Sequence, residues 1–190
     1  MKKTIILAFL LLFSINCMAQ SQKATIVSFV IMGAQNTELQ SLNGSDEIAF
    51  NERIYNETLD YLKREFNLDS INSTSKINIK NNINRLSGVK KLSKNELENT
   101  NFSDVVFKIK CDISFNETNA GFLTNQPTSR AFVYLSIGVF NNKGEFLDEY
   151  KAKTKDNIIN IGRNQVSAQW LSLNDFYTAY SELLTELVKQ

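Results

Sequence analysis

The sequence predicts a single α/β (α+β) domain, in which helices pack on one mixed β-sheet. Three observations support this fold class. A short apolar run rich in β-branched residues occupies positions 24–32, and an apolar alternation of period two recurs between positions 105 and 154. Apolar residues three and four positions apart then mark one helix after Asp46 and another at the C-terminus. We expect an N-terminal strand, a three-strand meander and a C-terminal helix.

The first two elements are a strand and a long helix. Residues 24–32 (ATIVSFVIM) predict a buried strand that ends at Gly33, and residues 35–45 are polar and predict a loop. From Asp46 one helical face is apolar, with Ser45 as the expected N-cap. The apolar residues of that helix are Ile48, Ile54, Tyr55, Leu59, Leu62 and Phe66.

The middle of the chain predicts short helices. The spacing of Ile79, Ile83 and Leu86 favours a short helix that Gly88 closes, and Ser93 with Glu96 matches a capping box that opens another turn.

The second half predicts the meander and the final helix. Residues 105–115 alternate in hydrophobicity, residues 133–139 repeat the pattern, and residues 146–154 return after a turn that contains Gly144. Ser172 and Asp175 then match a capping box. The apolar residues of the helix that follows are Phe176, Ala179, Tyr180, Leu183, Leu184, Leu187 and Val188.

Composition excludes several classes of function. The chain has 190 residues, 21 basic and 20 acidic, so its net charge of +1 indicates neither nucleic acid nor a membrane surface as a partner. It contains no histidine, which excludes Ser-His-Asp and Cys-His catalysis and histidine-ligated zinc. We expect no cofactor, no metal and no transmembrane segment.

The N-terminus has the layout of a secretory signal peptide. Lys2 and Lys3 precede the nine apolar residues 5–13, and Cys17-Met18-Ala19 places small residues before a cleavage site at Gln20. The apolar run is shorter than the roughly 20 residues that span a bilayer. We therefore expect residues 1–19 to be a signal peptide, residues 20–190 to form the domain, and the protein to be periplasmic or associated with the outer membrane. A lipid anchor on Cys17 is the alternative, although Asn16 stands where a lipoprotein normally has a small residue.

These features together resemble a known group of proteins. The leader, the opening strand, the amphipathic helix and the late run SDVVFKIKCDISF…RAFVYLSIGVFNNKGEFLDEYKAKT are similar to small bacterial envelope lipoproteins. The similarity is to the penicillin-binding-protein activators and the curli-secretion lipoproteins, which have an α/β domain with this order of elements. The resemblance implies a binding or assembly role and assigns a role to no individual residue.

Motifs for catalysis are weak. Ser73–Lys76 and Ser87–Lys90 match the Ser-x-x-Lys spacing of penicillin-recognising enzymes, without the companion motifs of that fold. Glu57 and Asp60 are close enough on one helix to share a task, but ordinary ion pairs also explain them. Cys111 lies on the apolar face of its strand and is expected in the core.

Two surfaces are candidates for contact with a partner. Residues 71–95 carry six basic side chains and no acidic one: Lys76, Lys80, Arg85, Lys90, Lys91 and Lys94. The 116–130 connection is longer than a hairpin needs and contains the apolar pair Phe122-Leu123. The pair either contacts a partner or folds back onto the sheet.

The sequence therefore predicts an exported, non-catalytic envelope protein that binds another envelope protein as an assembly or regulatory adaptor. Two alternatives remain open. One is an envelope hydrolase that uses carboxylates or a Ser/Lys pair, and the other is a soluble carrier of a small ligand.

Overall fold

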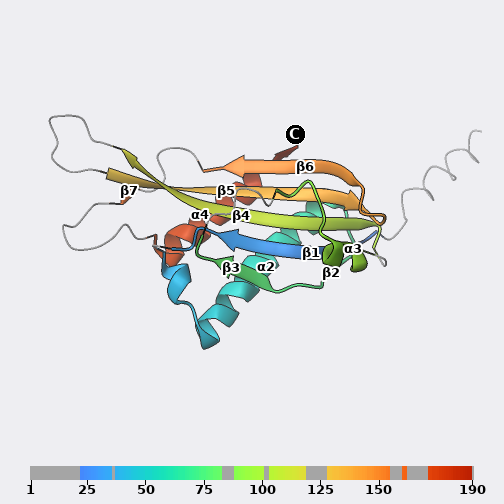
Figure 1. Cartoon of the computed structure of the whole chain (residues 1–190), viewed down its shortest axis with the longest axis horizontal. Coiled ribbons are helices and arrows are strands. Elements are labelled where there is room, and N and C mark those ends of the chain that lie inside the picture. The colour runs from blue at the N-terminus through green and yellow to red at the C-terminus, as the bar shows by residue number, and fades with distance from the viewer. Residues whose placement is uncertain are drawn as a thin grey trace, which may run out of the picture.

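One mixed β-sheet organises the molecule (Figure 1). The computed structural model describes residues 22–35, 37–82, 88–100, 103–118, 128–154, 160–161 and 171–189. Its strands are β1 (Lys23–Met32), β2 (Ser70–Ser73), β3 (Ile77–Lys80), β4 (Val105–Thr118), β5 (Thr128–Asn141), β6 (Phe146–Lys153), β7 (Asn160–Ile161) and β8 (Val188–Lys189).

The strand order confirms the predicted fold class. The sheet runs β2-β1-β4-β5-β6-β8, with β3 also pairing β1 and β7 pairing β5. β1 is parallel to β2, β3 and β4, whereas β4, β5 and β6 form the antiparallel meander. The turn between β5 and β6 has Gly144 at φ 77°, a left-handed conformation that glycine adopts without steric cost.

Two helices cover one face of the sheet. These are α2 (Gly44–Phe66) and α4 (Leu173–Glu186), which lie behind the strands in Figure 1. The two helices contact each other through Phe50 of α2 and Phe176 of α4, whose ring centroids lie 5.8 Å apart. Their apolar sides pack on the inward residues of the central strands, and Cys111 is fully buried there, as predicted.

The ends of the two helices differ from the prediction. Ser45 was expected to cap the first helix, but the helix begins at Gly44 and Asn43 is its N-cap. The carbonyl of Asn43 accepts the first helical hydrogen bond, from the N–H of Asp46, so Ser45 lies inside the first turn. Val188 was expected in the last helix but pairs with Lys151 in β8, because α4 ends at Glu186.

The helix predicted from Ile79 onward is wrong in its described part. Residues 77–80 form β3, with Ile77 beside Phe29 and Ile79 beside Ile31. Alternate residues of a strand point to the same face, so both isoleucines face the helix side of the sheet. Their apolar character therefore reflects the period of two of a strand and not a helical spacing. Residues 83–87 lie outside the described part of the chain.

Two other expectations need adjustment. The polar stretch 35–45 includes a 3-10 helix, η1 (Glu38–Ser41). The connection between the long strands is shorter than the predicted 116–130, because β4 and β5 pair as far as Thr118 and Thr128. The capping box at Ser93 is confirmed, since the Ser93 hydroxyl accepts from the Glu96 N–H and the Glu96 carboxylate accepts from the Ser93 N–H. At Ser172 only the N-cap half forms: its hydroxyl accepts from the Asp175 N–H, whereas the Asp175 carboxylate accepts from that hydroxyl. Ser93 and Glu96 begin the short helix α3 (Lys94–Glu98).

Residues 88–93, which we call the strap, cross the opposite face of the sheet. Val89 of the strap is buried against Gly138 of β5. Leu92 packs on a second, smaller apolar cluster that consists of Val27, Val106 and Phe140. The strap therefore covers part of this face over β1, β4 and β5 and leads into α3.

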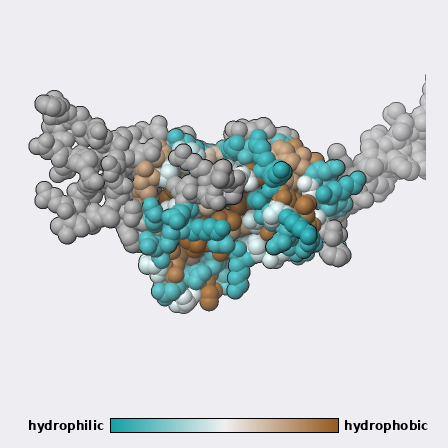
Figure 2. Space-filling view, in the orientation of Figure 1, coloured by the Kyte–Doolittle hydropathy of each residue, from teal (hydrophilic) through white to brown (hydrophobic). Residues whose placement is uncertain are grey.

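We call the remainder of this side the open face. In Figure 1 it faces the viewer, and in Figure 2 hydrophobic residues lie there among hydrophilic ones. No described helix of the size of α2 or α4 covers it. Its residues are Ser28, Val30, Met32, Asn78, Lys80, Lys108, Lys110, Asp112, Tyr134, Ser136, Glu149, Lys151 and Lys153.

Candidate functional site

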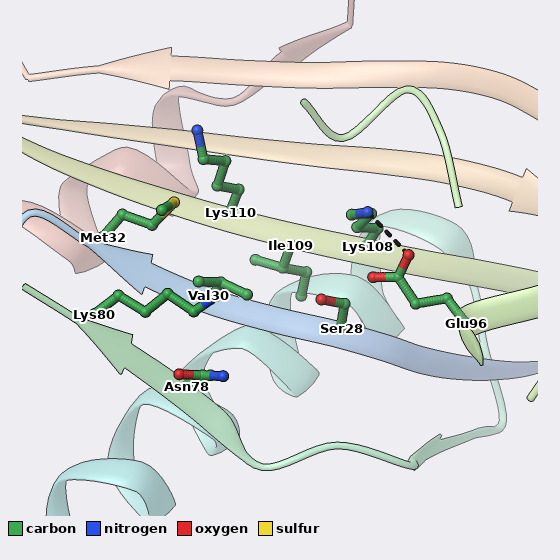
Figure 3. A pocket seen from close by; sticks show the side chains of 9 residues that line it. All are labelled: Ser28, Val30, Met32, Asn78, Lys80, Glu96, Lys108, Ile109 and Lys110. Carbon is green, nitrogen blue, oxygen red and sulfur yellow. Dashed lines mark hydrogen bonds and ion pairs between the residues drawn. The ribbon is translucent and has the colours of Figure 1, made fainter. Parts of the chain in front are cut away.

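A pocket of about 260 Å³ opens on this face, where β3, β1 and β4 lie side by side (Figure 3). Glu96 of α3 forms one end of it. Apolar side chains and lysines share the lining, which consists of Ser28, Val30, Met32, Asn78, Lys80, Glu96, Lys108, Ile109 and Lys110.

The sheet register places lysines across the whole open face. One row runs from Lys80 through Met32, Asp112 and Tyr134 to Lys153. The next row contains Lys110 and Lys151, which flank Ser136. Alternate residues of a strand point to the same face, so all these side chains project away from α2 and α4.

Three carboxylates form ion pairs with lysines of this surface. Lys108 Nζ lies 2.9 Å from Glu96 Oε2, and Lys110 Nζ lies 2.9 Å from Asp112 Oδ2. Glu149, 5% exposed, receives Lys151 Nζ at 2.8 Å and the strap residue Lys90 at 3.2 Å. These ion pairs attach the strap to the sheet and orient the lysines around the pocket.

The β3 side of the pocket carries polar groups that form no such ion pair. No hydrogen bond or ion pair joins the side chains of Ser28, Asn78 and Lys80 to another described residue. A register shift in β1 between Ile26 and Ser28 brings Ser28 onto the same face as Val30. The hydroxyl, the amide and the ammonium group are thus available to a ligand.

Glu96 is the lining residue whose pKa is displaced. Burial opposes its ionisation, but hydrogen bonds from the Ser93 N–H and from Lys108 outweigh that effect and lower the pKa of Glu96 below its ordinary value. The carboxylate is therefore ionised at neutral pH. Lys108 also donates a hydrogen bond to the carbonyl of Lys91 at 2.9 Å, which joins the strap to the same group.

We expect Glu96→Gln to cost about 1 kcal/mol of unfolding free energy at pH 7, because the ion pair with Lys108 is lost. Gln at this position still fits the capping box. A lowered folded-state pKa stabilises the protein above the unfolded pKa of an ordinary carboxyl, and this contribution is lost as pH falls through the lowered value. Urea denaturation of both proteins between pH 7 and pH 3 should show the difference shrinking below about pH 4. A difference that stays constant across this range would contradict the assignment.

The predicted surface residues do not form one site. Lys80 lines the pocket, Lys90 pairs with Glu149, and the carbonyl of Lys91 binds Lys108. Lys76 and Lys94 are exposed outside the pocket lining. Arg85, Phe122 and Leu123 lie outside the described part of the chain.

The sequence analysis missed the lysines that β4 and β6 contribute. Lys108 and Lys110 alternate with buried residues of β4, and Lys151 and Lys153 alternate with Tyr150 and Ala152 of β6, which are half-buried against the core. That alternation was the available signal, because it places all four on one face once the strands pair. A search for consecutive basic residues could not detect them.

Of the candidate catalytic motifs, Ser73–Lys76 and the Glu57–Asp60 pair lie within the described residues, whereas Ser87 of the Ser87–Lys90 motif lies outside them. Ser73 ends the strand β2 and its hydroxyl bonds Tyr55 and the Ser75 carbonyl, so Lys76 is not one helical turn away. Glu57 pairs with Arg53 at 3.1 Å and accepts a hydrogen bond from Ser181. Complete burial raises the pKa of the Cys111 thiol, which disfavours the nucleophilic thiolate.

Comparisons with known proteins find similarity in structure but not in sequence. No family model and no curated protein matches the chain. A solved structure from Helicobacter pylori, described as a neuraminyllactose-binding hemagglutinin homologue, superimposes with a TM-score of 0.44 at 9% identity. The match covers 88% of this chain and 83% of the other. In the described residues no helix has the length and apolar character to cross a membrane, and no group of three metal-ligating side chains occurs.

Proposed function

We propose that the chain is an exported, non-catalytic binding protein whose partner is another envelope protein. The observation that carries this proposal is the lysine-bearing open face, because helices cover the opposite side of the same sheet. Lysines arranged on a broad, partly apolar surface favour contact with an acidic protein surface. Export rests on the leader pattern of residues 1–19.

The partner contacts the open face along the row of side chains that begins at Lys80 and ends at Lys153. Lys80 and Lys153 are both exposed, and they project from β3 and β6, on either side of β1, β4 and β5. Their charges attract an acidic partner and orient it on the sheet, whereas the half-buried Val30 offers apolar contact on the same face. The Phe122-Leu123 pair remains a second proposed contact.

The test is affinity capture of the tagged protein from mildly crosslinked cell envelopes. We expect the double variant Lys80→Glu/Lys153→Glu to lose a specific partner by roughly tenfold or more, because two attractive charges become repulsive. The charge-matched control is Lys63→Glu/Lys143→Glu, which alters exposed lysines of α2 and of the β5–β6 turn. Circular dichroism verifies that both variants fold.

Retention of the partner by the Lys80/Lys153 variant would contradict the role of the open face. A parallel capture with Phe122→Asp/Leu123→Asp tests the second contact. The intact mass of the recovered protein distinguishes cleavage before Gln20 from acylation at Cys17.

A further inference from the structure

The β3 side of the pocket combines three hydrogen-bond donors. In Figure 3 the Lys80 side chain extends from β3 toward Val30, with Asn78 on the same strand and Ser28 on the neighbouring strand β1. A hydroxyl, a carboxamide and an ammonium group can all donate to the same anionic oxygen atoms. The three side chains have no hydrogen bond or ion pair to another described residue, so a ligand displaces only water from them.

The charge around these donors favours an anion. The described open face, together with Lys90 and Glu96 that form ion pairs with it, brings together six lysines and three carboxylates: Lys80, Lys90, Lys108, Lys110, Lys151 and Lys153, with Glu96, Asp112 and Glu149. Glu96 and Asp112 each lie against a lysine of β4. Lys80 is the lining lysine without a described carboxylate beside it.

The apolar part of the lining limits what else the ligand contains. Val30 lines the same pocket as the donors, and Met32, which is largely buried, lies beside Lys80 in the register. A volume of about 260 Å³ accommodates an anionic group together with a few carbon atoms.

We infer that this pocket binds an oxyanion, a carboxylate or phosphate group, through Lys80, Ser28 and Asn78. Lys80 supplies the charge, the hydroxyl and the amide donate hydrogen bonds, and the apolar residues contact the carbon atoms next to the anionic group. The inference rests on the proposed function, because it assigns one chemical group to the surface that the partner contacts. The group belongs either to a free small anion or to an acidic side chain of the partner.

Nuclear magnetic resonance titration of the purified, ¹⁵N-labelled protein tests the inference at constant ionic strength. One arm uses inorganic phosphate, and the other uses N-acetyl-aspartate methylamide, which presents a carboxylate as a protein side chain does. We expect saturable shifts of the Ser28, Val30, Asn78 and Lys80 amide signals in at least one arm. Tighter binding of phosphate assigns the group to a free anion, and tighter binding of the aspartate derivative assigns it to a protein side chain.

Two variants and a control define the site. Lys80→Met should weaken binding roughly tenfold through loss of a charge-assisted hydrogen bond, and Asn78→Ala should weaken it severalfold. Lys76→Met is the matched control, because Lys76 is exposed and precedes β3 without lining the pocket. It should bind as the wild type does. Shifts that remain linear in both arms, or an unchanged affinity in Lys80→Met, would overturn the inference.

The two proposals fail separately. Saturable anion binding without a captured partner overturns the proposed adaptor function and retains the pocket as a small-anion site. A captured partner that depends on Lys80 and Lys153, without saturable binding of either probe, overturns the pocket inference alone.

Discussion

Replacement of Phe107 by alanine should lower the unfolding free energy by about 3–5 kcal/mol, the cost of removing a large aromatic side chain from a rigid core. Phe107 is fully buried in β4, and its ring meets the Phe66 ring edge-on at 5.0 Å. Phe66 also contacts Tyr150 at 5.3 Å, so the substitution weakens the attachment of the α2 C-terminal turn to β4 and β6. Urea denaturation followed by circular dichroism measures the loss.

The matched control is Phe146→Ala. Phe146 is 39% exposed and lies at the start of β6 with its ring 5.7 Å from that of Phe140. We expect this substitution to cost less than about 1.5 kcal/mol, because most of its cost is one aromatic contact. Equal losses for the two variants would mean that burial against α2 does not dominate the stability of this region.

Replacement of Gly138 by alanine should displace the strap and cost about 2–3 kcal/mol, near the upper end for overpacking. A Cβ atom at this position would lie 2.2 Å from the Val89 carbonyl oxygen and 3.0 Å from its carbon. Both atoms belong to the backbone, so the contact cannot be relieved by rotating a side chain. The strap must move away from β5, which separates Lys90 from the buried Glu149.

Limited digestion with trypsin gives the direct measurement for this variant. Lys90 and Lys91 lie within the strap, and we expect faster cleavage there in Gly138→Ala than in the wild type. Gly88→Ala is the control, because a Cβ atom at Gly88 meets nothing within 4 Å. Unchanged cleavage in Gly138→Ala would show that the strap tolerates the added atom in place.

The long elements were predictable because burial imposes a clear period on them. The alternation through Cys111 in β4 and the apolar face of α4 both arise from one side packing on the core. The short strands β2 and β3 were not predicted. β2 (SINS) is half-exposed and largely polar, and β3 has only the apolar residues Ile77 and Ile79, too few to distinguish a strand from a helical turn.

The pocket was only partly predictable for a related reason. Lys80 was identified by the absence of acidic residues around it in the sequence. Lys108 and Lys110 were identified only as the polar phase of a strand, because their proximity to Lys80 depends on the pairing of β1 with both β3 and β4. Ser28 could not be assigned to the open face, since the register shift that places it there interrupts the simple alternation.

The parallel pairing of β1 with β4 has a consequence for the order of folding. The Lys23 N–H bonds Asp104 across a sequence separation of 81 residues, and the whole β1–β4 ladder joins segments equally distant in the chain. Such non-local pairing slows folding, because a long loop must close before the contacts form. During N-to-C synthesis, β1 therefore lacks its long partner β4 until the chain up to Asp112 has been made, and only the short strands β2 and β3 can pair with this strongly apolar strand earlier. Delayed folding keeps the chain extended during this interval and leaves β1 as the segment in which premature self-association would begin.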